Sequence, residues 1–255
     1  MRYTPAMGQG AAQEETRQVD IAWKDRVFAF RCFNNRQSIE IARQIFAGET
    51  YRPIPYIRDV RLIVDIGANI GATSVYLHTQ YPEARILAVE PSATAFALLK
   101  QNTAPFAQIE PRQTALYDKK ASLPLRAGNM DTTTNSFGAS VLARKTGETL
   151  GLEDAAGFFL REGAQSADIV KLDTEGCEWP ILNTMRPWLG QFRVIYLEYH
   201  SEIDRHRIDA LLEPTHLLHG GIVHHVHRGE FCYVARSALP PNSMEASLEI
   251  RPPEI

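Results

Sequence analysis

The sequence predicts an α/β protein built on a mostly parallel sheet with helices on both faces. From Arg61 onward, short apolar runs alternate with helical patterns, as in parallel strands joined by crossover helices. The apolar run LIVDI is followed at once by the glycine-containing turn GANIG, residues 67–71. Near the end, two strand patterns joined by a short turn predict a hairpin, which places one antiparallel strand in the sheet.

Composition and charge limit the function classes. The chain has 255 residues, 44% hydrophobic and 22% charged, which is typical of a globular protein with a sizeable core. The formal net charge of -3 and the lack of a basic stripe argue against nucleic-acid binding. We see no signal peptide and no run of about 18 apolar residues, so we expect no membrane span. Three widely spaced cysteines suit a reducing compartment, and we expect a cytoplasmic protein.

We expect three parts along the chain. Residues 1–58 are predicted to be an N-terminal extension, because the alternation of strands and helices begins only after them. The Pro-broken segment YRPIPYIRD marks the boundary. The main domain then spans residues 59–237, and the Pro-rich residues 238–255 form a tail without regular structure.

The extension has its own order of elements. Residues 1–18 are polar and small, which favours a loose arm. The alternating segment 19–33 contains a Lys-Asp turn and predicts a β-hairpin. Apolar residues at helical spacing predict a helix over residues 38–49, which Gly48 ends.

Seven strands are predicted for the main sheet, at residues 61–67, 85–91, 111–118, 168–173, 192–200, 216–226 and 230–237. Helices are predicted between them at residues 72–81, 92–102, 150–162, 178–188 and 201–213. Ser92 and Ser201 are expected to cap their helices. Two short strand patterns, at residues 121–127 and 140–145, flank a polar loop over residues 128–140 that is long enough to be functional.

The turn after the first strand points to a ligand site. Ligands of open α/β sheets bind beyond the carboxyl ends of the strands, and Gly67 and Gly71 let the backbone bend tightly there. Asn69 replaces the middle glycine of the dinucleotide fingerprint, which disfavours the close approach of a pyrophosphate. Glu90 ends the second strand, where a carboxylate can accept hydrogen bonds from both hydroxyls of a ribose.

Asp65 adds a charge at the same place. A carboxylate at the end of an apolar strand should meet backbone N–H groups, a cation, or both. A nucleoside that carries an amino acid would supply an ammonium group, and S-adenosylmethionine combines an amino acid, a sulfonium, a ribose and adenine. The turn and Glu90 favour this molecule, and an NAD-dependent oxidoreductase on a similar sheet is the alternative.

A second group of polar residues ends the fourth strand. The segment DIVKLDTEGCEWPIL, residues 168–182, brings a lysine and three acids together around a glycine. Acids suit a helix N-terminus, which accounts for Glu175 and Glu178. A position at a helix N-terminus accounts less well for Asp173, which should lie nearer the ligand crevice at the carboxyl ends of the strands.

Together, VDIGANIGATSVYL, AVEPS and DIVKLDTEGCEWPIL resemble the FkbM family of S-adenosylmethionine-dependent methyltransferases. That family reads V-D-x-G-A-N-x-G, then x-x-E-P, then K-x-D-x-E-G-x-E, and the matches occur here in that order. The resemblance implies the class I methyltransferase fold, a Rossmann-like, seven-stranded, mostly parallel sheet that ends in an antiparallel hairpin. The N-terminal hairpin and helix would be an addition to it.

The resemblance also implies roles for single residues. The residues around the methionine part of the cofactor would be Asp65, Gly67, Ala68, Asn69 and Gly71. Glu90 would hold the ribose, and Ala115 and Leu116, at the end of the third strand, would lie near the adenine. The residues that face the substrate would be Lys171, Asp173 and Glu175.

Methylation of an alcohol also needs a group that removes a proton, and such a base adds about 10²–10⁴-fold to a rate. Glu198 and His200 are two residues apart, so they share one face at the end of the fifth strand, beside Asp173. We hypothesise that His200 or Asp173 accepts the proton and that Glu198 orients or charges its partner. Alternatively, His200 caps the following helix or is solvated. A divalent cation on Asp173, Glu198 and His200 is a further alternative, but the spacing is not diagnostic and no metal site is predicted.

The expected function is O-methylation of a hydroxyl on a sugar or secondary metabolite, as the resemblance implies. The expected partner is a small-molecule or saccharide acceptor, and a homo-oligomer is left open. Besides the oxidoreductase, the second alternative is a catalytically inactive module that binds a nucleoside. Retention of Lys171, Asp173 and Glu175 argues against that alternative.

Overall fold

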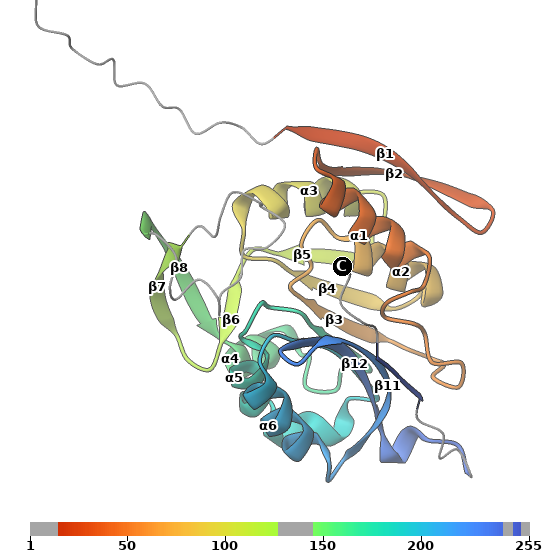
Figure 1. Ribbon diagram of the computed structural model, residues 1–255, viewed down its shortest axis with the longest axis vertical. Coiled ribbons are helices and arrows are strands. Elements are labelled where there is room, and N and C mark those ends of the chain that lie inside the picture. Colours follow the sequence, from red (N-terminus) through yellow and green to blue (C-terminus); the bar gives the residue numbers. More distant parts are fainter. Residues whose placement is uncertain (1–14, 127–144, 242–246, 251–255) are drawn as a thin grey trace, which may run out of the picture.

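An eight-stranded sheet forms the centre of the molecule (Figure 1). The computed structural model describes residues 15–126, 145–241 and 247–250. The strand order is β13-β11-β12-β10-β9-β3-β4-β5. The bounds are β3 (Leu62–Ile66), β4 (Arg85–Val89), β5 (Ile109–Arg112), β9 (Ile169–Leu172), β10 (Val194–Tyr199), β11 (His216–His225), β12 (Arg228–Ala235) and β13 (Ser247–Ile250).

The predicted fold class is confirmed. Without β13, the order of the strands is that of the class I methyltransferase sheet, with the first strand of the alternating region in the middle. Within the described part of this sheet, β12 alone runs antiparallel to its neighbours β10 and β11. The terminal hairpin therefore supplies the single antiparallel strand, as predicted.

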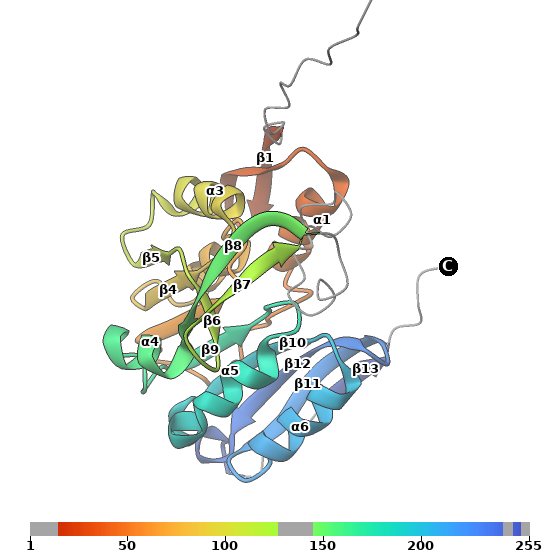
Figure 2. The same cartoon turned by 90° about the vertical axis from the view of Figure 1, so that its left-hand side faces the viewer.

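Helices cover both faces of the sheet (Figures 1 and 2). One face carries α1 (Arg36–Phe46), α2 (Ala72–Gln80) and α3 (Ala93–Thr103). The other carries α4 (Ala155–Glu162), α5 (Glu178–Thr184) and α6 (Glu202–Leu212). Short 3-10 helices follow α5 (η2, Arg186–Gln191) and β12 (η3, Arg236–Ala238). Ser92 and Ser201 cap α3 and α6 as predicted, since their side chains accept backbone N–H bonds.

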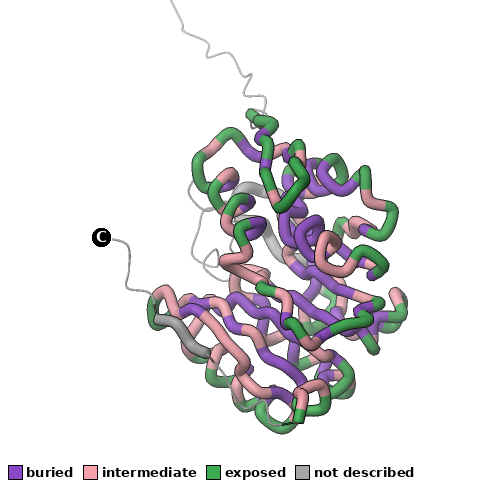
Figure 3. The backbone as a smooth tube through the Cα atoms, turned by 90° about the vertical axis from the view of Figure 1, so that its right-hand side faces the viewer, coloured by how far each residue is buried: buried purple, intermediate pink, exposed green. Residues whose placement is uncertain are grey.

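The alternation of side chains along the strands divides the core in two. In β3, Ile63 packs with the cluster of buried residues around α1 to α3, whereas Val64 and Ile66 pack with the cluster around α4 to α6. Neighbouring side chains point to opposite faces of a strand, so one apolar run supplies both layers. Full burial of each such side chain contributes about 1.5–3 kcal/mol. The buried strands run through the interior, and most of the exposed backbone lies outside them (Figure 3).

The N-terminal extension packs on the first of these faces. Strands β1 (Thr16–Trp23) and β2 (Arg26–Phe33) pair antiparallel around a turn at Lys24 and Asp25, which confirms the predicted hairpin. The first strand of the hairpin begins at Thr16, three residues before the predicted start at residue 19. Phe30 and Ile45 join the same cluster of buried residues as Ile63 of β3. The extension and the sheet therefore share a core, and the predicted boundary near residue 58 remains a prediction.

Helix α1 begins earlier than predicted. The side chain of Asn35 accepts the backbone N–H of Ser38 at 2.7 Å and caps the helix, so Arg36 and Gln37 are helical as well. The helix ends at Phe46, just before Gly48, whose φ of 72° is left-handed.

The predicted third strand is wrong in its second half. β5 ends at Arg112, and β6 (Ala115–Tyr117) belongs to a separate three-stranded sheet. In that sheet β6 pairs parallel with β8 (Lys145–Asp154), and β8 pairs antiparallel with β7 (Ala121–Arg126). Each residue of β6 pairs with a residue of β8 that lies 37 positions further along the chain, so the local apolar pattern does not reveal the break.

Two further predictions need correction. The helix predicted over 150–162 starts only at Ala155, because residues up to Asp154 belong to β8 and Asp154 caps the helix by accepting Gly157 N–H at 2.8 Å. The tail predicted to be irregular contains β13, which pairs parallel with β11. The predicted loop 128–140, most of the strand at 140–145 and most of the N-terminal arm lie outside the described residues.

Candidate active site

The turn after β3 has a backbone that few residue types adopt. Gly67, Asn69 and Gly71 have φ angles of 81°, 49° and 91°. All three lie in the left-handed region, where glycine is unstrained and asparagine is better tolerated than most other residues. The spacing G-x-N-x-G is therefore a requirement of the backbone. We call residues 67–71 the donor turn, after the methyl donor that the sequence predicts to bind there.

The two glycines also allow close packing. A Cβ atom on Gly67 would lie 1.7 Å from the backbone oxygen of Asp173, which follows β9. A Cβ atom on Gly71 would lie 2.7 Å from Cδ1 of Leu99 in α3. Ala68 is buried, and its N–H donates to the oxygen of Val89 at 2.9 Å. The donor turn is thus held in place by β4, by the residue after β9 and by α3.

Asp65 pairs with a cation that the chain itself supplies. It lies beside Lys171 in the parallel pairing of β3 and β9, and its Oδ1 is 3.2 Å from Nζ of Lys171. Its Oδ2 accepts a hydrogen bond from the Ser74 hydroxyl at 2.6 Å, and the side chain is fully enclosed. The predicted need of Asp65 for a cation is met by Lys171, so balancing its charge requires no ligand ammonium.

Lys171 is enclosed between the donor turn and β9, and its predicted place on the substrate side remains a prediction. Its side chain is 2% exposed, and its Nζ donates to the oxygen of Gly67 at 2.7 Å. Burial works against its charge, but the carboxylates of Asp65 and Asp173 outweigh burial and raise the pKa of Lys171. Lys171 is therefore charged in the neutral range, and its side chain links β9 to the donor turn.

Glu90 follows β4 and is oriented by the backbone. Its Oε2 accepts the N–H of Asn69 at 2.9 Å, and its Oε1 accepts the N–H of Ser92 at 2.7 Å. Burial raises the pKa of Glu90 to about 7, in spite of these two hydrogen bonds. Each carboxylate oxygen has a second lone pair, so the group is held in place and still able to accept from a diol.

Asp173 begins the turn after β9 and lies among charges of both signs. Its Oδ2 accepts a hydrogen bond from the Tyr51 hydroxyl at 3.3 Å and is 3.6 Å from Nζ of Lys171. Burial and the negative charge of Glu198 raise the pKa of Asp173 to about 8, although Lys171 acts in the opposite direction. A carboxyl group with this proton affinity is suited to general-base catalysis near neutral pH.

Tyr51 comes from the N-terminal extension and is not among the predicted site residues. Its φ of 51° is left-handed, a conformation that a bulky residue keeps only when its surroundings enforce it. Its ring packs edge to face on Tyr196 with the centroids 5.9 Å apart, and Nζ of Lys171 lies 5.5 Å from its centroid. The sequence shows only that Tyr51 lies in a Pro-broken segment. That position does not reveal that its side chain points toward Asp173.

Glu198 forms an ion pair that the sequence does not indicate. Its Oε1 is 2.5 Å from Nε of Arg228, at the start of β12, and 3.5 Å from Nε2 of His200. Burial opposes the ionisation of Glu198, but His200 and Arg228 outweigh it and lower its pKa to about 2. Glu198 is thus an anion throughout the neutral range.

His200 lies among three carboxylates. Besides Glu198, its Nε2 is 3.2 Å from Glu175 and its Nδ1 is 3.2 Å from Glu178. Burial works to lower its pKa, but the hydrogen bonds to Glu178 and Glu198 outweigh burial and raise the pKa of His200 to about 11. Because an imidazolium has no free lone pair, His200 is unsuited to accept a proton at neutral pH.

Glu178 holds the turn after β9 together. Its Oε1 accepts the N–H groups of Thr174 and Gly176 at 2.9 Å and 3.0 Å. This turn contains two left-handed residues in succession, Glu175 with φ 56° and Gly176 with φ 108°. The glycine among the acids is therefore a conformational requirement, and Glu178 orients both this turn and His200.

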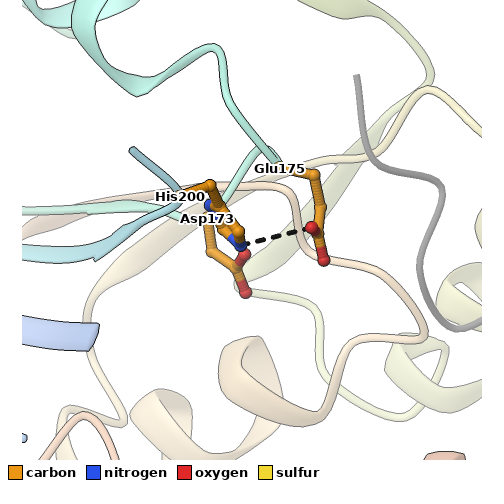
Figure 4. A group of neighbouring side chains, drawn as sticks. All are labelled: Asp173, Glu175 and His200. Atoms are coloured by element: carbon orange, nitrogen blue, oxygen red, sulfur yellow. Dashed lines mark ion pairs between the residues drawn. The ribbon is translucent and has the colours of Figure 1, made fainter. Parts of the chain in front are cut away.

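Asp173, Glu175 and His200 converge (Figure 4). Each places one potential ligand atom within 4.8 Å of the others, as a divalent-cation site would require. The set differs from the alternative considered in the sequence, which has Glu198 in place of Glu175. The dashed line in Figure 4 marks the ion pair between His200 and Glu175, so a protonated His200 already neutralises part of this charge.

Ala115 and Leu116 lie on β6, both 5% exposed. They therefore extend from the three-stranded sheet, not from the end of the third strand of the main sheet. Leu116 packs with the cluster of buried residues around α4 to α6. Their contact with adenine remains a prediction.

A model of the FkbM methyltransferase domain matches residues 65–219, more than half of the chain. The match includes the donor turn, Glu90 and the charged residues Asp173, Glu175, Glu178, Glu198 and His200, but not Arg228. The chain therefore belongs to the FkbM methyltransferase family. S-adenosylmethionine is the cofactor that this family membership supports, in preference to the NAD-dependent alternative.

Individual relatives are distant. The methyltransferase sdnD of Sordaria araneosa is 26% identical over 208 residues, which cover 68% of this chain and 79% of that protein. The 2-O-methyltransferase NoeI of Sinorhizobium fredii is 23% identical over 194 residues, which cover 69% of this chain and 76% of that protein.

Solved structures are more distant still. The fibrillarin pre-rRNA processing protein of Methanococcus jannaschii has a TM-score of 0.48 and 12% identity, with 90% of this chain and 86% of that chain covered. Fibrillarin of Aeropyrum pernix, in complex with S-adenosyl-L-methionine, has a TM-score of 0.44 and 14% identity, with 76% and 74% covered.

Among the described residues, no helix combines the length and the apolar character that crossing a membrane requires.

Proposed function

We propose that the chain transfers a methyl group from S-adenosylmethionine to a hydroxyl oxygen of a sugar or secondary metabolite, with Asp173 as the general base. The observation that carries the proposal is the position of Asp173, a half-buried carboxyl group whose residue is in backbone contact with Gly67 of the donor turn. The name of NoeI, a 2-O-methyltransferase, supports an alcohol acceptor at the level of a distant relative.

The residues of the first two strand ends suit the donor. Asp65, Gly67, Ala68, Asn69 and Gly71 would surround its methionine part, Glu90 would accept hydrogen bonds from its ribose, and Ala115 and Leu116 would lie near its adenine. The oriented carboxylate of Glu90, with both oxygens directed by backbone N–H groups, is the feature that fits a diol. When bound, the donor supplies a methyl group that its sulfonium already activates.

Asp173 is a better base than His200. Its pKa, raised to about 8, lies near neutral pH, whereas that of His200 is raised to about 11. The positive charge of a sulfonium nearby would favour the carboxylate form of Asp173. In this proposal Asp173 removes the hydroxyl proton. The side chains of protonated His200, Glu198 and Glu175 lie beside Asp173 and set its electrostatic surroundings.

The reaction proposed here needs no metal. A protonated His200 already neutralises part of the negative charge that a cation between Asp173, Glu175 and His200 would neutralise. We therefore expect unchanged methylation after dialysis against EDTA and unchanged rates on adding Mg²⁺ or Mn²⁺. A rate that falls at least tenfold with EDTA and returns with Mg²⁺ would replace the base mechanism with a metal-assisted one.

Mass spectrometry tests the function directly. The wild-type protein is incubated with S-adenosylmethionine and panels of sugars, glycolipids and natural-product alcohols, and products 14 mass units heavier are sought, the difference that replacing H by CH₃ makes. Fragmentation should place the methyl group on oxygen. Binding of S-adenosylmethionine without turnover on any panel would favour the inactive module, and methylation on nitrogen or carbon would contradict the proposed acceptor.

A further inference from the structure

The N-terminal hairpin is joined to the donor turn by one side chain, Asn102 of α3. We propose that Asn102 is a positioning residue of the donor site, through which the hairpin holds the donor turn in its binding conformation. The inference rests on the proposed binding of S-adenosylmethionine at this turn. On this inference the N-terminal hairpin contributes to binding of the cofactor, because it stabilises the donor turn.

Asn102 uses its whole amide group. Its Oδ1 accepts the backbone N–H of Arg31 in β2 at 2.8 Å, and its Nδ2 donates to the backbone oxygen of the same residue at 2.9 Å. The side chain thus occupies the place of a neighbouring strand beside Arg31. The second N–H of Nδ2 donates to the backbone oxygen of Ile70 at 2.8 Å. One amide therefore connects the hairpin with the donor turn.

The atom that Asn102 binds lies at a sensitive place. Ile70 stands between Asn69 and Gly71, whose φ angles of 49° and 91° are both left-handed. The carbonyl of Ile70 is therefore fixed by a backbone with few alternatives. Helix α3 also contacts the turn through Leu99, which leaves no room for a side chain at Gly71. Asn102 adds a polar contact to this apolar one.

Burial makes the contact hard to replace. Asn102 is 8% exposed, and its bond to Ile70 is buried. Removing the amide leaves one N–H and two carbonyl oxygens without their partner, and a buried unpaired group is more costly than a lost exposed bond. Relaxation of the donor turn is the simplest way to hydrate the Ile70 oxygen. That relaxation would also change the neighbouring N–H of Asn69, which holds Glu90.

The first experiment compares two asparagines by isothermal titration calorimetry with S-adenosylmethionine at 15 °C, with the folded state confirmed by thermal melts. Asn102→Ala should weaken binding about tenfold, the equivalent of one lost hydrogen bond. The control, Asn35→Ala, removes the cap of α1 in the same extension and touches no residue of the donor turn. It should lower the melting temperature and leave the dissociation constant within about twofold, since a loss of stability alone does not change the affinity of folded protein.

The second experiment needs no variant. Coupling between sites is reciprocal, so binding of S-adenosylmethionine must stiffen the hairpin if the hairpin stabilises the donor turn. Hydrogen exchange at the Arg31 amide of the wild-type protein should slow about threefold or more when S-adenosylmethionine is added. This measurement keeps the inference testable if Asn102→Ala does not fold.

The outcomes separate the inference from the function. If wild-type protein does not bind S-adenosylmethionine, the donor site and the inference both fail. If it binds, but Asn102→Ala binds equally well or Asn35→Ala weakens binding as much, only the inference is overturned. Unchanged exchange at Arg31 on saturation with S-adenosylmethionine would overturn it too.

Discussion

The donor turn and the charged cluster after β9 and β10 lie side by side but are held by different forces. Residues 67–71 owe their shape to backbone: left-handed glycines and an asparagine, and N–H groups directed at Val89 and Glu90. The cluster around Asp173 and His200 owes its arrangement to ion pairs between side chains, among them His200 with Glu175 of the turn after β9 and Glu198 of β10 with Arg228 of β12.

This difference indicates what each region does. A turn defined by backbone presents one fixed shape, which suits a cofactor that is the same in every reaction of the family. Burial and neighbouring charges set proton affinities, and here they raise the pKa of Asp173 and of His200 and lower that of Glu198. Shifts of this kind concentrate at sites of chemistry.

The largest expected effect comes from Gly67→Ala, at the point where the two regions touch. The new Cβ would lie 1.7 Å from the oxygen of Asp173 and would strain a φ of 81°. We expect about 4 kcal/mol of lost unfolding free energy and no measurable binding of S-adenosylmethionine. Denaturant unfolding and calorimetry measure both quantities.

Gly163→Ala is the matched control for that change. Gly163 also has a left-handed φ, 67°, but a Cβ there meets nothing within 4 Å. It should show only the backbone strain, about 1 kcal/mol. Equal losses in the two variants would mean that contact with Asp173 does not constrain Gly67.

Asp173→Asn should break the chemistry and spare the donor turn. We expect kcat to fall about 10²–10⁴-fold on the acceptor found by mass spectrometry. The affinity for S-adenosylmethionine should stay within about tenfold, because the backbone contact with Gly67 is kept. The exposed Asp20→Asn is the control, and a kcat within threefold of wild type would remove Asp173 as the base.

The same variant predicts a pH dependence of stability. The pKa of Asp173 is raised from 3.8 to about 8, so the native state loses stability as pH rises through this window. Asparagine removes that loss. Asp173→Asn should therefore be more stable than wild type at pH 9 and show no such advantage at pH 4, which urea unfolding at the two pH values measures.

Glu90→Gln should act on the donor side alone. An ionised carboxylate is a stronger acceptor for ribose hydroxyls than an amide, so we expect binding of S-adenosylmethionine to weaken about tenfold. Burial raises the pKa of Glu90 to about 7, so wild-type affinity should increase as pH rises through 7 and that of the variant should not. The exposed Glu83→Gln serves as control. A pH profile of binding shared by wild type and Glu90→Gln would contradict the role of Glu90.

Tyr51→Phe should have the smallest effect. It removes the hydroxyl that donates to Asp173 and keeps the ring beside Lys171. A hydrogen bond to the carboxylate favours its charged form, so its loss should shift the acid limb of the pH–rate profile upward and lower kcat about threefold at pH 7. Tyr56 lies in the same extension, and its hydroxyl contacts His219 of β11. Tyr56→Phe should leave the pH–rate profile in place. An unshifted profile in Tyr51→Phe would show that Tyr51 only packs.

Several elements of the site are predictable because they depend on neighbours in the sequence. Asn69 and the glycines of the donor turn are recognisable since left-handed backbone selects few residue types. Glu90 is recognisable because it ends a strand of the alternating pattern. The break between Arg112 and Ala115 is not, since β8 pairs with β6 from far along the chain.

The sequence by itself determined the alternation of strands and helices in the main sheet and the turn after its first strand, because these follow from apolar periodicity and local backbone requirements. It also indicated the family, through the resemblance of three motifs. Only the tertiary structure decided that Lys171 is enclosed with Asp65, that His200 is held as a cation, and that Tyr51 and Asn102 connect the extension to the site. The physical reason is distance along the chain. The role of a charged or amide side chain depends on the partners that folding brings close to it. Those partners lie far from it in the sequence, so the residues next to it do not reveal them.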